Sequence, residues 1–321
     1  MQVKTVCSAM ALWAVLHSVA HGEEVSNPWL QRLQAAQSTQ SYQGAFVYER
    51  KSVFSTHQVW RQVQAGGDVQ ERYLQLNGPA HELVRMGGRT TCSSAANDDD
   101  FVVADTWPVQ ALNVAEIERW YEVRDIGRSR VAGRDTVVLL FAPRDQHRYP
   151  IELHLDAESA IPLKSLLLNE HGQLLERFQF VQFQAVKSDQ YLAVEAGAGC
   201  HAVANTASAL ELELDVDWSV SWVPPGFTLL NSHYRMAADG VAKVLRQAYS
   251  DGVAHFTVFF EQVDYPGLEG GRRQFGPTSV ASRKFRSDQL EVMVTVVGEI
   301  PLGAAERIAL SMQDQSGIAH D

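Results

Sequence analysis

The stretch "RYPIELHLDAESAIPLKSLLL", residues 148–168, carries the pattern that decides the fold. It places Ile151, Leu153 and Leu155 on one face of a strand, with polar residues between them, and a second apolar run follows after a turn. Alternation with a period of two is typical of a strand that buries one face. The stretch therefore predicts two strands with an apolar face, and it raises the question of what that face contacts.

Outward from this stretch, the same alternation predicts a long antiparallel meander within residues 23–195. The predicted strands cover residues 42–48, 59–63, 72–76, 82–86, 89–92, 135–141, 149–155, 163–168 and 174–183. A short amphipathic helix is expected at residues 27–40, where Asn27 suits the cap and Pro28 the first turn, and a helical insert at residues 107–123. Because so long a meander must curl or close to protect its edges, the sequence predicts a half-open β-barrel with covering helices.

A second, smaller domain is predicted at residues 216–317, after an Ala- and Gly-rich linker at residues 196–215. Residues 240–263 have the pattern of a hairpin that turns around residues 250–252, and residues 290–300 predict a further strand. Residues 301–313 predict a closing amphipathic helix. The predicted fold class is therefore α+β, mainly antiparallel β, in two domains.

The first 22 residues predict a secretory signal peptide. Lys4 precedes an apolar run at residues 6–19, and small residues near Gly22 supply cleavage positions. A retained membrane anchor is the alternative, but a run of about 14 apolar residues is short for a membrane span. The sequence therefore predicts an exported protein that is soluble once residues 1–22 are removed.

The charge balance is acidic, with 27 Lys and Arg against 38 Asp and Glu and a net charge of −11. This balance disfavours nucleic acid as a partner. One stretch, residues 270–287, runs against it and contains basic but no acidic residues. Its cations are Arg272, Arg273, Arg283, Lys284 and Arg286. A solvated loop and a binding surface for anions are both open interpretations of this stretch.

Two cysteines, Cys92 and Cys200, lie beyond the predicted signal peptide. Export would permit a disulfide between them. Two unpaired thiols are an equally good interpretation, because the sequence does not supply the distance between the two residues.

The sequence contains no pattern that points to catalysis or to a metal. The G-x-S-x-G motif of serine hydrolases is absent, and the histidines lack the spacing of metal ligands. The acidic runs at residues 97–100 and 211–217 lack the glycine of a calcium loop. We therefore expect neither an enzyme nor a metal or cofactor site, although a triad that assembles only in space stays open.

Apolar residues of the predicted strands are candidates to line the concave interior of the first domain. They are Phe46, Tyr48, Trp60, Leu74, Leu139, Phe141, Leu153, Leu155, Leu166, Phe178 and Phe180. A filled core, covered by the two predicted helical segments, is the alternative. An accessible interior would suit an acyl chain, because each buried methylene contributes about 0.8 kcal/mol.

Five segments follow one another along the chain: "LQLNGPAHELVRMGG", "VAGRDTVVLL", "RYPIELHLDAESAIPLKSLLLNEHGQLLERFQF", "WVPPGF" and "VGEIPLGAAERIA". Together they resemble the MucB/RseB family of periplasmic regulators of the envelope-stress sigma factor, some of which restrain alginate production. The resemblance covers both predicted domains in their order. None of the segments is diagnostic alone, so the specificity comes from their combination.

The resemblance implies a first domain similar to the half-barrel of lipoprotein carriers and a periplasmic negative regulator. Such a regulator binds the periplasmic domain of a membrane-anchored, MucA-like anti-sigma factor and shields it from the site-one protease. Lipopolysaccharide or acylated lipid fragments are implied to release that hold. The apolar face of residues 148–168 would then belong to an acyl pocket, and the cations of residues 270–287 would meet lipid phosphates or acidic groups of the partner.

A periplasmic lipid or lipoprotein carrier is the alternative function, because it would use the same half-barrel. A homodimer also stays open, since nothing in the sequence reports the oligomeric state. A ligand shifts such a protein only through different affinities for its free and partner-bound states. We therefore expect the two domains to rearrange about residues 196–210.

Overall fold

The computed structural model describes residues 27–79, 81–94, 113–187, 190, 192, 194–203, 218–236, 243–263, 269–286 and 291–314. They form two large antiparallel sheets that pack around separate hydrophobic cores, which confirms the predicted fold class. The predicted signal peptide, residues 1–22, lies outside the described residues. No helix in the described part of the chain is long and apolar enough to cross a membrane.

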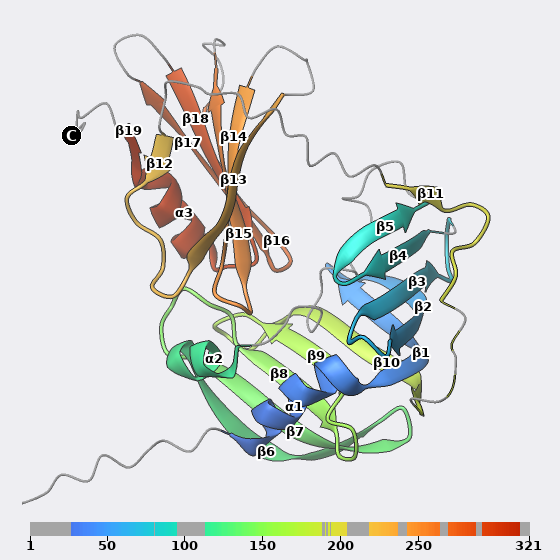
Figure 1. The fold of residues 1–321 in the computed structure, drawn as a ribbon. Coiled ribbons are helices and arrows are strands. Elements are labelled where there is room, and N and C mark those ends of the chain that lie inside the picture. The colour runs from blue at the N-terminus through green and yellow to red at the C-terminus, as the bar shows by residue number, and fades with distance from the viewer. Residues whose placement is uncertain are drawn as a thin grey trace, which may run out of the picture.

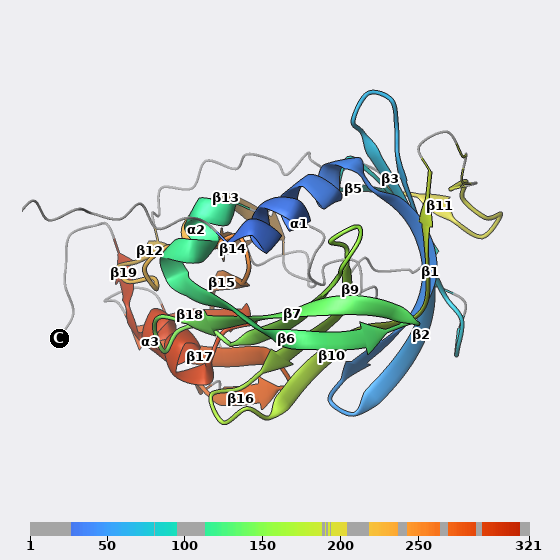
Figure 2. The same cartoon turned by 90° about the horizontal axis from the view of Figure 1, so that it is seen from below.

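The larger sheet has eleven antiparallel strands and is strongly curved (Figures 1 and 2). The strands are β1 Ser41–Arg50, β2 Val53–Val63, β3 Val69–Gln75, β4 Glu82–Met86, β5 Arg89–Ser93, β6 Tyr121–Val131, β7 Arg134–Pro143, β8 Ile151–Asp156, β9 Pro162–Leu168, β10 Leu174–Val186 and β11 His201–Ala202. Their order is β11-β5-β4-β3-β2-β1-β10-β9-β8-β7-β6. The pairing of β1 with β10 joins the two runs of the meander, and β11 and β6 form the edges of the described sheet.

The stretch at residues 148–168 forms β8 and β9, which pair antiparallel in the middle of one run. Ile151 is 5% exposed, and Leu153 and Leu155 are fully buried, as the alternation predicted. A slip of one residue would turn all three side chains to the opposite face of the sheet. Burial of this face therefore fixes the register of β8.

Two helices, α1 (Pro28–Thr39) and α2 (Val114–Trp120), lie inside the curve of the large sheet (Figure 2). The side chain of Asn27 caps α1 by accepting a hydrogen bond from the N–H of Trp29 at 2.9 Å. Pro28 occupies the first helical position, where no backbone N–H is needed. The two helices bury Leu30, Leu33, Ala36, Val114 and Ile117.

The second domain contains a six-stranded sheet with the order β13-β14-β15-β18-β17-β16. The strands are β13 Thr228–Met236, β14 Lys243–Ser250, β15 His255–Gln262, β16 Arg272–Phe275, β17 Thr278–Arg286 and β18 Glu291–Gly298. A short pair, β12 Trp218–Val220 and β19 Met312–Asp314, flanks the sheet, and helix α3 (Leu302–Leu310) packs against it. Phe256, Val258 and Phe260 are fully buried in this core together with Ile308 of α3.

Most predicted elements are confirmed, including the first helix, the nine predicted strands, the turn at residues 250–252 and the closing helix. One assignment is wrong: residues 121–123, predicted as part of a helical insert, begin the strand β6. Residues 107–112 of that insert lie outside the described residues. The cations of the basic stretch, for which a solvated loop and a binding surface were both open, lie on the hairpin β16–β17. Strand β6 lacks an apolar alternation because it is an edge strand whose side chains are mostly exposed and charged.

Candidate functional site

The first part of the concave wall is an aromatic cluster on β1 and β10. The ring centroids of Phe46 and Phe178 lie 4.7 Å apart, and those of Phe178 and Phe180 lie 5.2 Å apart. Tyr48 extends the cluster, and its hydroxyl donates a hydrogen bond to Glu176 at 2.7 Å. The antiparallel pairing of β1 with β10 brings these residues together from distant parts of the sequence.

The second part of the concave wall is an aliphatic cluster on β7 and β8. Leu139, Phe141, Leu153 and Leu155 are all fully buried there. Leu30 and Leu33 of α1 and Ile117 of α2 pack in the same cluster. The helices thus cover the face that the alternation of residues 148–168 predicted to be apolar.

Three predicted wall residues do not lie on this wall. Trp60 packs on the opposite face of the sheet, against the segment at residues 186–194. Tyr73, the residue before Leu74, packs in the aromatic cluster, and Leu167, the residue after Leu166, packs in the aliphatic cluster. Because successive side chains of a strand point to opposite faces, Leu74 and Leu166 point outward. The prediction is wrong at these positions because a period of two does not say which face of an isolated strand is buried.

The concave wall is filled, which is the alternative that the sequence left open. The other predicted wall residues are at most 8% exposed. Residues of α1 and α2 pack on the aliphatic cluster, and Ala36 of α1 packs with Ala160 and Ile161 on the aromatic cluster. Figure 2 shows both helices inside the curve of the sheet. Helix α1 has 12 residues, near the length below which an isolated helix is unstable in water. Its position therefore depends on the packing of Leu30 and Leu33.

The basic residues of the hairpin β16–β17 are divided between the two faces of the smaller sheet. Arg272 and Arg283 lie on the face that α3 covers, and both pair with Glu306 of that helix. The distance between Nη1 of Arg272 and Oε2 of Glu306 is 3.0 Å. These two cations therefore share one carboxylate.

The opposite face of the same hairpin contains Lys284 and Arg286, which both pair with Glu291 of β18. Hydrogen bonds from these two cations lower the pKa of Glu291. Arg273 is exposed, and its register opposite Val280 places it on this face as well. The hairpin therefore divides the five predicted cations, with two beside Glu306 on the α3 face and three on the opposite face, where Glu291 lies.

Cys92 of β5 and Cys200 form a disulfide, with a Cα–Cα distance of 5.6 Å. It fixes the segment at residues 194–203 to the first domain, where β11 pairs with β5 and the N–H of Gly197 donates to Glu82 at 2.8 Å. On the chain-entropy model, closing a loop of 108 residues stabilises the fold by about 4–5 kcal/mol. The first part of the predicted linker is therefore attached to the large sheet.

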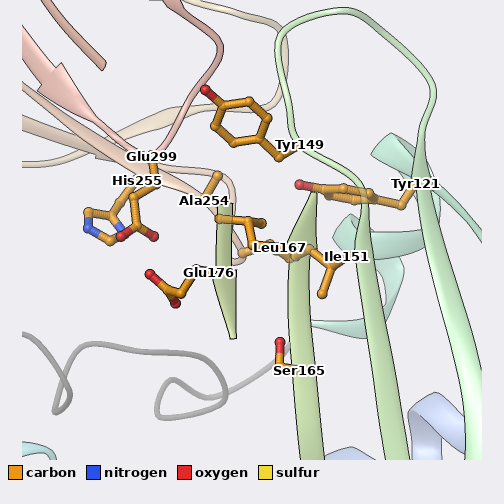
Figure 3. Close-up of a pocket in the computed structure, with 10 residues that line it drawn as sticks. Tyr121, Tyr149, Ile151, Ser165, Leu167, Glu176, Ala254, His255 and Glu299 are labelled. Carbon is orange, nitrogen blue, oxygen red and sulfur yellow. The ribbon is translucent and has the colours of Figure 1, made fainter. Parts of the chain in front are cut away.

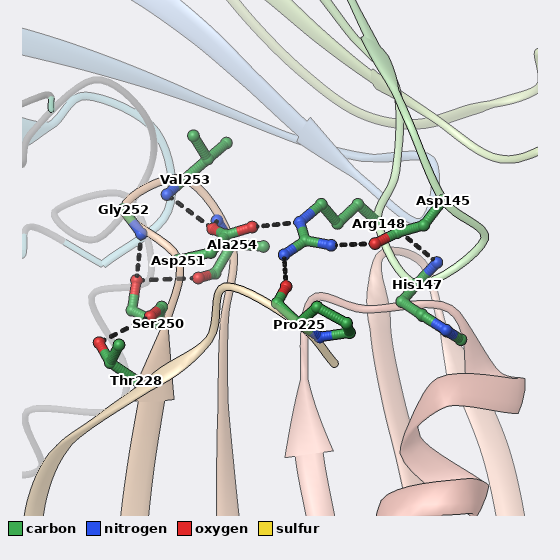
Figure 4. A network of polar contacts seen from close by, with 10 residues as sticks. All are labelled: Asp145, His147, Arg148, Pro225, Thr228, Ser250, Asp251, Gly252, Val253 and Ala254. Atoms are coloured by element: carbon green, nitrogen blue, oxygen red, sulfur yellow. Dashed lines mark hydrogen bonds and ion pairs between the residues drawn. The ribbon is translucent and has the colours of Figure 1, made fainter. Parts of the chain in front are cut away.

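The junction between the two domains centres on Arg148, which lies before β8 and has a fully buried side chain (Figure 4). Its Nε donates to Oδ2 of Asp251 at 2.5 Å, and its other nitrogens donate to Asp145 and to the carbonyl of Pro225. Asp251 and Pro225 belong to the second domain. The guanidinium carbon of Arg148 lies 4.9 Å from the ring centroid of Trp120 and 4.9 Å from that of Phe227.

The partners of Arg148 are themselves held in place. Oδ1 of Asp251 accepts hydrogen bonds from the backbone N–H groups of Val253 and Ala254, at 2.9 and 2.7 Å. Gly226 has φ +88°, and a Cβ there would collide with the indole of Trp120. Only glycine therefore permits the close approach of the "PPGF" turn to the first domain.

A second set of contacts crosses the junction at the ends of β1 and β18. Arg50 donates to the hydroxyl of Thr278 and, at 3.1 Å, to Oε1 of Glu299. The hydroxyl of Tyr149 donates to the carbonyl of Ile300 at 3.1 Å. Residues of the first domain thus bind the second domain at two separate points.

Between these contacts lies a cavity of about 40 Å³ (Figure 3). Its walls come from both domains and combine apolar side chains with polar ones, among them Tyr149, Ser165, Glu176, His255 and Glu299. A cavity of this size holds water molecules. None of the eleven predicted wall residues lines this cavity.

Sequence reasoning missed the junction entirely. Arg148 and Asp251 are 103 positions apart, and each stands in an ordinary turn pattern that gives no sign of its partner. The turn at residues 250–252 was predicted correctly, but nothing in the sequence indicated that this turn and the "PPGF" segment contact the same arginine. Among the described residues, no group of three or more His, Cys, Asp and Glu could hold a metal ion.

The fold and the junction define a two-domain, mainly antiparallel β protein, in which a large curved sheet with a covered apolar wall contacts a smaller sheet. The chain belongs to the MucB/RseB family. Residues 26–198 match the MucB/RseB N-terminal domain, and residues 213–313 match the MucB/RseB C-terminal domain.

The relatives support this assignment over nearly the whole chain. The protein is 46% identical over 291 residues to the sigma factor AlgU regulatory protein MucB of Pseudomonas aeruginosa. This match spans 91% of this chain and 92% of the relative. It is 25% identical over 300 residues to the sigma-E factor regulatory protein RseB of Escherichia coli, and this match spans 90% of this chain and 91% of the relative.

Two solved structures match over most of this chain. The complex of Pseudomonas aeruginosa MucA/MucB matches with a TM-score of 0.79 and 46% identity, over 89% of this chain and 97% of that chain. A crystal structure of MucB matches with a TM-score of 0.68 and 44% identity, over 89% of this chain and 96% of that chain.

Proposed function

We propose that this protein is a periplasmic negative regulator of an envelope-stress sigma factor, of the kind that governs alginate production. It acts by binding the periplasmic domain of a membrane-anchored, MucA-like anti-sigma factor. The observation that carries the proposal is the 46% identity to MucB over 91% of the chain. The match spans both domains, so it includes the junction as well as the sheets.

The closed junction is the arrangement that we assign to partner binding. The TM-score is 0.79 for the structure that contains MucA and 0.68 for the crystal structure of MucB, although identity and coverage are nearly equal. A score over the whole chain falls when two intact domains are placed differently. The higher score for the MucA-containing structure supports our assignment of the arrangement described here to a partner-competent state.

Binding of the anti-sigma segment would shield it from the site-one protease. A protease needs its substrate in an extended and accessible form, and a segment held against a folded protein lacks that freedom. The cations Arg272, Arg273, Arg283, Lys284 and Arg286 are the proposed contact for acidic groups of the partner or for phosphates of a lipid. Two carboxylates for five cations leave donors on this hairpin for such groups.

Lipopolysaccharide or an acylated fragment of it is the proposed signal for release. The aromatic and aliphatic clusters of the concave wall are the proposed acyl site, entered when α1 moves aside. Each methylene transferred to this wall contributes about 0.8 kcal/mol, so an acyl chain of ordinary length can compensate for the loss of the packing of α1. A ligand of this kind would release the partner only if it binds the partner-free state more tightly.

The second candidate is a periplasmic lipid or lipoprotein carrier, which the curved sheet and its apolar wall would also serve. A carrier leaves the second sheet and its basic hairpin without a role. We further propose that residues 1–22 are a signal peptide, that residues 23–195 and 216–317 act as domains joined by residues 196–215, and that the protein catalyses no reaction.

A protection assay separates regulator from carrier. Protein that lacks residues 1–22 is mixed with the periplasmic segment of the anti-sigma factor, and cleavage by the site-one protease is followed over time. We expect the half-life of the segment to rise about tenfold or more once the complex is saturated, and lipopolysaccharide to restore cleavage. Binding of lipid without protection of the segment would instead support a carrier.

Matched charge variants sharpen this assay. Arg273→Glu reverses a charge on the basic hairpin, whereas Arg128→Glu reverses one on the edge strand β6, where Arg128 has a 63% exposed side chain. If the hairpin receives acidic groups, only Arg273→Glu should raise the protein concentration needed for protection, and added salt should weaken protection by the unmodified protein. Equal effects of both variants would argue against the hairpin.

A further inference from the structure

Two carboxylates from different domains face each other at the junction cavity (Figure 3). Glu176 stands near the start of β10 in the first domain, and Glu299 follows β18 in the second. Arg50 lies between them, with its Nη2 3.1 Å from Oε1 of Glu299 and its Nε 3.9 Å from Oε2 of Glu176. One guanidinium therefore serves two carboxylates.

Glu176 is the more enclosed of the two carboxylates. Its side chain is 12% exposed, against 26% for Glu299. Burial and the charge of Glu299 raise the pKa of Glu176 from 4.5 to about 7, although the hydrogen bond from Tyr48 and the charge of Arg50 act in the opposite direction. The titratable and charged groups around the cluster are Tyr48 and Arg50 of β1, Tyr121, Tyr149, Glu170, His255 of β15 and Glu299.

This environment exists only while the domains are in contact. Separation removes Glu299 and the turn at residues 253–255 from Glu176, and solvent then restores an ordinary carboxyl pKa. The closed junction thus binds a proton more tightly than the open one. Because the pKa is raised in the closed state, the added stability is fully present below about pH 4.5 and is lost as the pH rises through about 7.

We propose that Glu176, Arg50 and Glu299 form a proton-controlled clasp between the two domains, which tightens when the carboxylate pair takes up a proton and loosens when it gives the proton up. The clasp concerns the contact of the domains themselves, so it does not depend on which partner or lipid the protein binds. The Arg148 network holds the domains at a separate point and has no residue in common with the clasp.

Thiol labelling at the cavity measures how often the junction opens. Ala254 lines the cavity, packs in the core of the second domain and is 8% exposed, so a cysteine in the Ala254→Cys variant should react faster with a small thiol reagent when the domains part. Labelling of residue 254 is read by peptide mass spectrometry and divided by the rate for a free cysteine peptide at each pH. We expect protection to fall on the order of tenfold between pH 5.5 and pH 8.5.

Three second-site variants decide whether Glu176 is responsible. Adding Glu176→Gln should keep protection high at both pH values, because glutamine mimics the protonated carboxyl and still accepts from Tyr48. Adding Glu122→Gln, which changes a side chain of the edge strand β6 that is 57% exposed, should leave the pH dependence intact, and so should His255→Gln. Persistence of the pH dependence with Glu176→Gln, its loss with His255→Gln, or flat protection in the parent would each overturn the proposal.

A scattering measurement covers the case in which Ala254→Cys does not fold. The radius of gyration of the unmodified chain should then rise between pH 5.5 and pH 8.5, and that of the Glu176→Gln variant should not. Equal changes in both proteins would reject the clasp.

Discussion

Replacing Arg148 with alanine is expected to lower the free energy of unfolding by about 3–5 kcal/mol, the usual cost of removing one partner of a buried ion pair. The substitution leaves Asp251, whose side chain is 0% exposed, without its cation. It also removes the guanidinium from between the rings of Trp120 and Phe227. Denaturant unfolding, followed by signals from both domains, measures this loss.

An exposed arginine provides the control for this variant. Arg128 pairs with Asp125 at 2.9 Å, with side chains that are 63% and 39% exposed. Arg128→Ala should cost no more than about 1 kcal/mol, because an exposed pair is screened by water. The double variant Arg148→Met, Asp251→Asn should be more stable than Arg148→Met alone, because asparagine at position 251 leaves no unpaired buried charge. A loss below about 1 kcal/mol for Arg148→Ala would show that the two domains are not fastened at this point.

Replacing Leu153 with alanine is expected to cost about 2–5 kcal/mol, as for other large-to-small changes in a packed core. Leu153 is fully buried, and the helices α1 and α2 close over its cluster. The same change at Leu166 removes the same atoms from a half-buried side chain on the outer face of the adjacent strand. Leu166→Ala should therefore cost clearly less, about 1 kcal/mol at most.

Thermal or chemical unfolding of the two leucine variants tests which face of the large sheet is packed. Because the substitutions are chemically identical, differences in helix or strand propensity largely cancel. Equal losses, or a larger loss for Leu166→Ala, would contradict the assignment of the concave wall.

The secondary structure could be predicted where it depends on residues that are close together in the sequence. The alternation of Ile151, Leu153 and Leu155 predicted a strand with one buried face, and the structure has that strand. Asn27 and Pro28 predicted the start of α1, because a cap and a first-turn proline act within a few residues of each other. The strand β6 was not predicted, because an edge strand with charged side chains has no apolar alternation in its sequence.

The candidate site was less predictable, because it depends on which elements meet. Trp60, Leu74 and Leu166 belong to correctly predicted strands, but the choice of the buried face depends on where α1, α2 and the segment near residue 194 pack. Arg148 and Asp251 meet only after both domains have folded. The sequence leaves such a contact open, since Arg and Asp in surface turns are common.

The central claim is that the closed two-domain arrangement binds the periplasmic segment of an anti-sigma factor and that lipid reverses this binding. Calorimetric titration of the segment into protein that lacks residues 1–22, with and without lipopolysaccharide, tests it most directly. The account predicts saturable binding with one segment per protein in the absence of lipid, and loss of the binding heat in its presence. Absence of binding in the first titration, or identical heats in both, would contradict it.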